Sequence, residues 1–176
     1  MRRVLFLAAA AVLTAAPTVS RNELRGLERR FDESIQRFNI DDPLDLIGPS
    51  RGLYIENYGV VFSSEVALVT VPLETPFRPR PKPEDVERLR QKKLARLPEM
   101  KKLMRNMMIT SAAALKTMPP KEQVVAGVTF FYQPWEHTTG LPAQLVMRAT
   151  RQSLVDMEAG RLKGAAALQA IEEHTY

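Results

Sequence analysis

The stretch that decides the fold is GLYIENYGVVFSSEVALVTV, residues 52–71. A short apolar run at 53–55 leads into Glu56-Asn57-Tyr58-Gly59, where Asn and Gly are typical of a hairpin turn. A longer run then alternates in polarity until Pro72, which ends the strand because proline has no N–H to donate. One face of this second strand is predicted to meet the core: Val60, Phe62, Ser64, Val66 and Leu68.

The rest of the chain supplies a third strand and several helices around this hairpin. Gln123–Gln133 is apolar at both odd and even positions, which predicts a central strand covered on both faces. Apolar steps of three or four residues predict an amphipathic helix over 21–38 and a long helix over 83–116. Within the long helix, Pro98 either introduces a kink or starts a second helix.

The remaining segments are predicted to connect and to finish the domain. Residues 39–51 read as a loop, and the proline-rich segment 76–83 as an extended linker. Pro142 is expected to start a helix that Gly160 ends, and 161–176 to form a short helical tail. The fold class is therefore α+β, a small antiparallel sheet packed against a long helix and flanking helices, in a single domain over 21–160.

The first twenty residues have the order of regions found in a secretory signal peptide. Arg2 and Arg3 precede an apolar run over 4–16 that is too short for a comfortable membrane span, and small residues follow up to Ser20. We expect cleavage after Ser20 and a periplasmic or secreted protein. An uncleaved membrane anchor is the alternative; after cleavage no transmembrane anchor is expected.

Composition excludes several classes of site. The 176-residue chain contains no cysteine, so it has no thiolate nucleophile, no cysteine-ligated metal and no lipoprotein anchor. Its two histidines are too few for most metal centres, and it has no glycine-rich phosphate loop and no catalytic serine motif. We therefore expect no metal and no cofactor.

Positive charge is concentrated in one segment. The formal net charge is +5, and residues 78–105 alone hold eleven basic and four acidic side chains. Nucleic acid is not expected, because aromatic residues are not interleaved with these cations. The candidate binding residues Arg88, Lys92, Lys93 and Arg96 therefore suggest an anionic envelope surface, and a solvated helix face is the plainer interpretation.

Two further candidate sites follow from particular residues. Trp135 is either a binding platform or a plug at the end of the core. The neighbouring Glu136 and His137, with Glu65 as a further carboxylate, could combine for acid–base chemistry, whereas a polar loop requires no function. Four methionines form either a core stripe or an adaptable hydrophobic groove: Met100, Met104, Met107 and Met108.

Three strings in the sequence also resemble a known group of proteins. These are YGVVF at 58–62 with the nearby Glu65-Val66, KLARLP at 93–98, and EQVV at 122–125. The chain resembles an uncharacterised family of small exported bacterial proteins of unknown function, over about residues 53–156. The resemblance implies a single exported domain and carries no catalytic or binding residue with it.

These observations favour a non-catalytic binding or interaction module of the cell envelope. Its expected partner is an anionic surface, contacted through the basic helix, or another protein. Two alternatives stay open: an enzyme with an acid–base site around Glu136 and His137, and an assembly subunit that forms a homo-oligomer through a free sheet edge.

Overall fold

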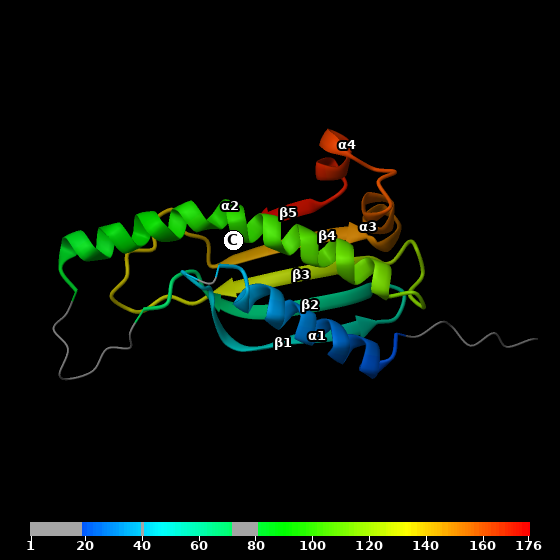
Figure 1. The fold of residues 1–176 in the computed structure, drawn as a ribbon, viewed down its shortest axis with the longest axis horizontal. Helices are drawn as coiled ribbons and strands as arrows, with labels where there is room; N and C mark the ends of the chain where they lie inside the picture. The colour runs from blue at the N-terminus through cyan, green and yellow to red at the C-terminus, as the bar shows by residue number, and fades with distance from the viewer. Residues whose placement is uncertain (1–18, 40, 72–80) are drawn as a thin grey trace, which may run out of the picture.

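The computed structural model describes residues 19–39, 41–71 and 81–176. The predicted leader, apart from its last two residues, and most of the predicted proline-rich linker lie outside these ranges. The elements are, in order, α1 (Arg21–Gln36), β1 (Asp45–Ile55), β2 (Gly59–Ala67), α2 (Pro83–Ala114), β3 (Gln123–Phe130), β4 (Gln144–Thr150), α3 (Arg151–Glu158), α4 (Gly164–Gln169) and β5 (Glu172–Thr175). The fold is α+β, as predicted (Figure 1).

The strands form one sheet in the order β1-β2-β3-β4-β5. Every neighbouring pair is antiparallel except β2 and β3, which run parallel. A parallel pair needs a long crossover, and α2 lies within it. At the β1–β2 turn, Asn57 and Gly59 both have positive φ, as the Asn and Gly of a hairpin turn predict.

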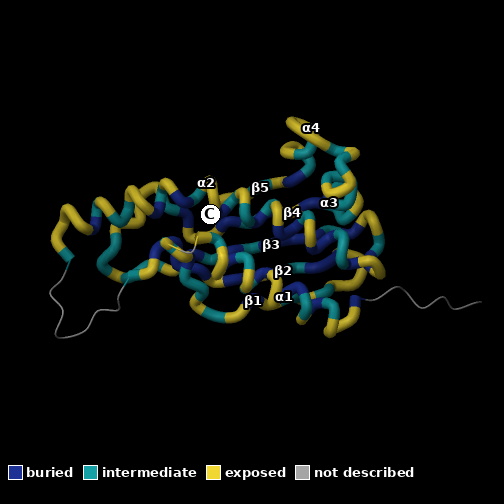
Figure 2. Tube along the Cα trace, in the orientation of Figure 1, coloured by how far each residue is buried: buried dark blue, intermediate teal, exposed yellow. Residues whose placement is uncertain are grey.

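Helices α1 and α2 lie on the same side of the sheet, and the core lies between these two layers (Figure 1). Their apolar stripes meet the even-numbered residues of β2 and β3, which are buried and contribute dark blue segments to these strands in Figure 2. Phe31 of α1 stacks on Phe62 of β2 with ring centroids 4.5 Å apart. Burial of these apolar surfaces is the main stabilising contribution to the fold.

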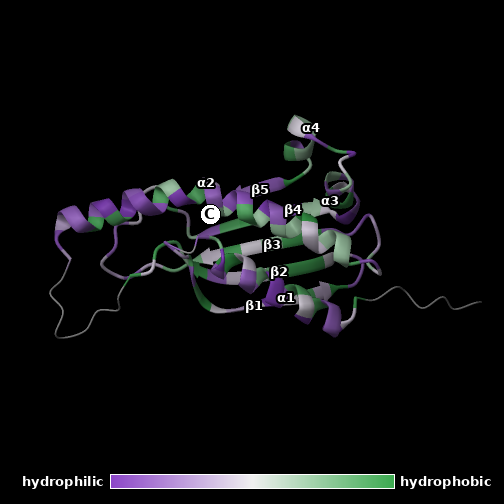
Figure 3. Ribbon diagram, viewed as in Figure 1, coloured by the Kyte–Doolittle hydropathy of each residue, from purple (hydrophilic) through white to green (hydrophobic). Residues whose placement is uncertain are grey.

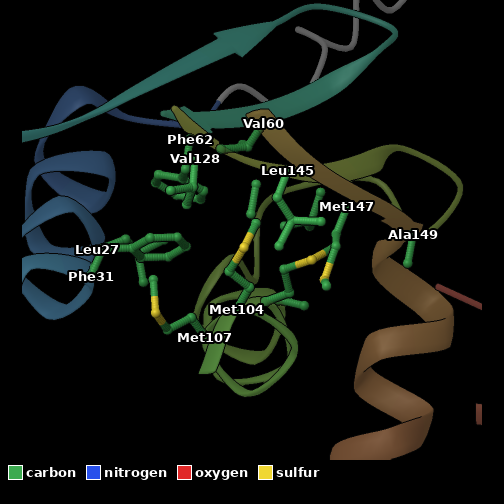
Figure 4. Packing of buried hydrophobic residues seen from close by; sticks show 14 of the residues in the cluster. Leu27, Phe31, Val60, Phe62, Met104, Met107, Val128, Leu145, Met147 and Ala149 are labelled. Atoms are coloured by element: carbon green, nitrogen blue, oxygen red, sulfur yellow. The ribbon is translucent and has the colours of Figure 1, made fainter. Parts of the chain in front are cut away.

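The four methionines belong to the core. Met100, Met104 and Met108 have no exposed surface and Met107 is 4% exposed. Figure 4 shows Met104 beside Leu145 and Met147 of β4. The core-stripe interpretation is confirmed, and the side chains are not available to line an open groove.

Helix α2 is continuous from Pro83 to Ala114 and passes through Pro98 without a break. Proline at 98 has no N–H to donate to the carbonyl of residue 94, and Pro98 itself lies on the exposed side of the helix. The N-terminal half of α2 is mostly hydrophilic in Figure 3 and extends beyond the end of the sheet. It lies there beside the loop that follows β3.

Three segments differ from the sequence-based expectation. Residues 45–51, predicted as loop, form the first part of β1, where register shifts accommodate Gly48 and Pro49. Residues 144–150, predicted as helix, form β4 because they pair along the whole of β3. The predicted helical tail contains only α4 and ends in β5.

The central strand β3 is covered by helices on one face only. Its side chains on the helix side are buried, whereas Gly127 and Thr129 on the opposite side are partly exposed. The expectation that both faces of β3 are covered therefore holds at Val125, which is 7% exposed, and is wrong at Gly127 and Thr129. Large apolar side chains remain exposed at the hairpin end of this face: Leu53, Ile55 and Tyr58.

The start of α1 ties the helix to the edge strand β1. Ser20 and Glu23 form a reciprocal capping box, which cleavage after Ser20 would destroy. Further along, Arg21 and Glu28 form an ion pair at 2.7 Å and bind the carbonyl and the N–H of Gly52, respectively. Burial opposes ionisation of Glu28, yet these bonds hold its pKa below the usual 4.5. Side chains thus occupy part of an edge that the assembly hypothesis needs free.

Candidate functional site

The cations of the basic segment are paired with carboxylates inside the domain. From Arg88 to Arg105 every described cation except Lys102 has a carboxylate within ion-pair distance. Some partners come from α2 itself, and the others come from segments far away in the chain: Asp42, Glu136 and Glu173. Most of this positive field is therefore neutralised locally.

Asp42 bridges two of the predicted binding residues. Its carboxylate lies 2.7 Å from Lys92 Nζ and is also paired with the guanidinium of Arg96. The bond from Lys92, supported by the charge of Arg96, lowers the pKa of Asp42 below its usual 3.8. Arg96 is buried and also donates to the carbonyl of Leu68, so it fastens the segment before β1 to the segment after β2.

Lys93 is the most deeply buried charged residue of the segment. Its side chain is 1% exposed and pairs with the carboxylate of Glu136, which is 4% exposed. The other carboxylate oxygen of Glu136 accepts the N–H of Gln133 at 3.0 Å. Such a pair tolerates burial because both charges are matched and hydrogen-bonded.

Tyr132 completes the surroundings of this buried pair. The Nζ atom of Lys93 lies 4.9 Å from the centre of the Tyr132 ring, close enough for a cation–π interaction. Burial, and then the charge of Glu136, raises the pKa of Tyr132, so its hydroxyl stays protonated and donates to the carbonyl of Pro142 at 2.8 Å. One ammonium is thus held between a carboxylate and an aromatic face.

A pocket of about 280 Å³ opens beside this pair. Lys93 and Glu136 line it together with the segments that follow the carboxyl ends of the parallel strands β2 and β3. In open α/β sheets, ligands bind at the carboxyl ends of parallel strands, and β2 and β3 are the parallel pair of this mostly antiparallel sheet. Most of the wall is apolar, with Asp45 and Gln133 as further polar groups: Leu46, Ile47, Ala67, Val69, Val71 and Phe131.

The residues predicted for acid–base chemistry do not come together. Glu136 points into its pair with Lys93, and Glu65 lines a separate hollow on the open face of the sheet. His137 is exposed, and its charge acts on Glu87 of α2. Bonds from Arg90 and Gln91, with a smaller effect of His137, lower the pKa of Glu87 to about 2. Among the described residues, Glu136 and Glu65 therefore line different pockets, and His137 faces the solvent.

Two other predicted binding residues lie away from the pocket lining. Arg88 is 79% exposed in its side chain and pairs with Asp85 one turn earlier, at 3.3 Å. Trp135 is partly buried, and its indole N–H is buried without a hydrogen-bond acceptor among the described residues. An unmatched buried donor is a cost to the folded state. Neither residue extends the pocket.

Sequence reasoning missed the partners that give the site its form. Asp42 and Asp45 lie in the segment 39–51 that is predicted as a loop, and Tyr132 lies in the predicted strand Gln123–Gln133. Their sequence signals are weak, because the contacts that matter bridge between 39 and 54 residues of chain. The sequence offers one clue to this pairing, which is the excess of cations in residues 78–105 together with isolated carboxylates elsewhere in the chain.

The described residues contain no cluster of three or more histidine or carboxylate side chains able to hold a metal ion. Over the same ranges, none of the helices combines the length and apolar character needed to cross a membrane. No protein-family model, curated protein or solved structure matches this chain.

Proposed function

We propose that this chain is an exported, non-catalytic binding module whose ligand enters the pocket beside Lys93. Export is supported by the leader-like order of the first twenty residues. Binding without catalysis is supported by the pairing of Glu136 with Lys93 and by the separation of Glu65 and His137 from it. The observation that carries the proposal is an apolar pocket that ends on a buried ammonium.

The polar groups in the pocket define the head of the ligand. Lys93 has three N–H donors, of which the pair with Glu136 uses one, so donors remain for a carbonyl oxygen. Asp45 lines the same pocket without an ion pair among the described residues and can accept an N–H. A primary amide supplies both groups, and it avoids the repulsion that a carboxylate meets at Asp45 and Glu136.

The apolar walls define the body of the ligand. A volume of about 280 Å³ lies just below the usual range for small-molecule sites, so the body is a short alkyl chain or a single ring. Ile47, Val69 and Phe131 would cover it. The proposed ligand class is therefore a small amphiphile with an amide head.

The test compares three heads on one hexyl-length body: hexanamide, hexanoate and hexylamine. Each is titrated into the full chain while backbone amide NMR shifts are followed. We expect hexanamide to bind most tightly and to shift the signals of Val69 and Gln133. The matched variants are Ile47→Trp, which fills the pocket, and Leu53→Trp, which alters another exposed apolar position on β1 outside the pocket lining. Saturable binding that Ile47→Trp leaves unchanged, or no binding by any of the three, contradicts the proposal.

A further inference from the structure

A groove lies between α1 and α2 on the side of the helical layer that faces away from the sheet, and it shares no lining residue with the pocket beside Lys93. Helices α1 and α2 form the two walls of this groove, whose volume is about 850 Å³. Phe38 and Leu103 contribute partly buried apolar side chains that also pack on the core. The rest of the lining is polar, so the groove combines an apolar floor with a charged rim.

The rim holds charged side chains of both signs that have no ion-pair partner among the described residues. On α1 these are Arg30 and Glu33, with Arg37 directly after the helix, and on α2 they are Glu99 and Lys102. Lys102 is the one described cation between Arg88 and Arg105 that lacks a carboxylate partner. Carboxylates therefore pair with the other described cations between Arg88 and Arg105, but not with the one that lines this groove.

The spacing along α1 gives the charges a readable order. Glu33 follows Arg30 by three residues and precedes Arg37 by four, so all three lie on one side of the helix. Arg30 and Arg37 are two turns apart, which is about 10.5 Å along the axis. The α1 wall therefore presents positive, negative and positive charge in sequence.

We infer that this groove is a docking site for an amphipathic helix of another protein. The complementary ridge has acid, base and acid at the spacing Glu-x-x-Lys-x-x-x-Glu, with an apolar residue on the same side to contact Phe38 and Leu103. The lining of α2 runs from Glu99 to Thr110, about 17 Å, which accommodates roughly three turns of such a helix. The guest helix adds a third member to the layer formed by α1 and α2.

The experiment uses two stapled helical peptides, because the natural partner is unidentified. One carries Glu-x-x-Lys-x-x-x-Glu with a leucine on the same face, and the other has the three charges inverted. Binding to the full chain is measured by fluorescence anisotropy at low salt. We expect the first peptide to bind at least about tenfold more tightly, because three attractive contacts replace three repulsive ones.

A charge-swapped variant tests whether the charges of the α1 wall determine which of the two peptides binds. Arg30→Glu/Glu33→Lys/Arg37→Glu should reverse the preference between the two peptides. The control Arg25→Glu/Arg29→Glu changes two exposed cations of α1 that lie outside the groove lining and have no ion pair within the described part of the chain, and it should leave the preference intact. Circular dichroism of each variant checks that the fold is kept. Equal binding of the two peptides, no binding, or a preference that the swap does not reverse overturns the inference.

Discussion

Removing one member of the Lys93–Glu136 pair should destabilise the domain far more than removing both. The two side chains are 1% and 4% exposed, so each charge depends on the other and not on water. Lys93→Met leaves the carboxylate of Glu136 buried with only the N–H of Gln133 as a partner. The expected loss is about 3–5 kcal/mol in the free energy of unfolding, and Glu136→Leu, which leaves the ammonium of Lys93 buried without its carboxylate, should cost a similar amount.

The double variant Lys93→Met/Glu136→Leu removes both charges and fills the space with apolar atoms. Its stability should lie within about 1 kcal/mol of the starting protein or exceed it, because neither side chain then needs a charged partner. The two single losses then exceed the loss in the double variant by about 5 kcal/mol or more, a coupling energy that is large for a pair in contact. These free energies of unfolding refer to neutral pH.

Urea unfolding followed by far-ultraviolet circular dichroism measures all four proteins of this cycle. The exposed pair Arg88 and Asp85 is the matched control, and its neutralisation should change stability much less. The reasoning is refuted if either single variant loses less than about 1 kcal/mol, or if the losses of the two single variants simply add in the double variant.

Three further changes probe the sheet, the core and the edge of β1. Gly59→Ala should abolish stable folding or cost more than about 3 kcal/mol, because a Cβ at this position would lie 1.9 Å from the carbonyl oxygen of Gln123 and the φ of Gly59 is +134°. A thermal melt close to that of the parent chain would contradict this. Met104→Ala should cost about 2–5 kcal/mol and Met104→Leu less than about 1.5 kcal/mol in urea unfolding, and equal effects would argue against a packed core position. Because folding lowers the pKa of Glu28, its stabilising contribution is complete above pH 4.5 and is lost as the pH falls through the folded-state pKa. Glu28→Gln should therefore flatten the loss of stability below pH 4.5. An unchanged dependence of stability on pH would exclude this role.

Local patterns in the sequence predict the hairpin and the long helix well, because short-range physics determines them. The turn at 56–59 fixes the pairing of β1 with β2, and the apolar spacing of α2 overrides the single proline at 98. The segment 144–150 is a different case: Leu145 and Ala149 fit a helical period, while Leu145, Met147 and Ala149 (the three buried side chains) fit a strand equally well. Pairing with β3 decides between them, and no local pattern contains that information.

The candidate site was less predictable than the fold. The sequence locates an excess of cations on α2 but cannot say that carboxylates from the segment before β1, the loop after β3 and the strand β5 will neutralise them. The sequence places Lys93 and Arg96 among the candidate binding residues of a basic surface, whereas both are buried, because helix periodicity does not distinguish a solvated cation from one buried against a carboxylate. Only the tertiary arrangement brings Lys93 into the wall of an apolar pocket.

The side-chain ammonium resonance of Lys93, recorded by nitrogen-detected lysine NMR with and without hexanamide, tests most directly whether Lys93 is both buried in its ion pair and part of the ligand site. We expect one ammonium signal that is strongly protected from exchange with water, disappears in Lys93→Met and shifts when hexanamide is added. The exposed ammonium of Lys102 serves as the internal control and should remain unprotected and unshifted. An unprotected Lys93 signal would contradict the buried pair, and a protected signal that hexanamide does not shift would contradict the proposed ligand site.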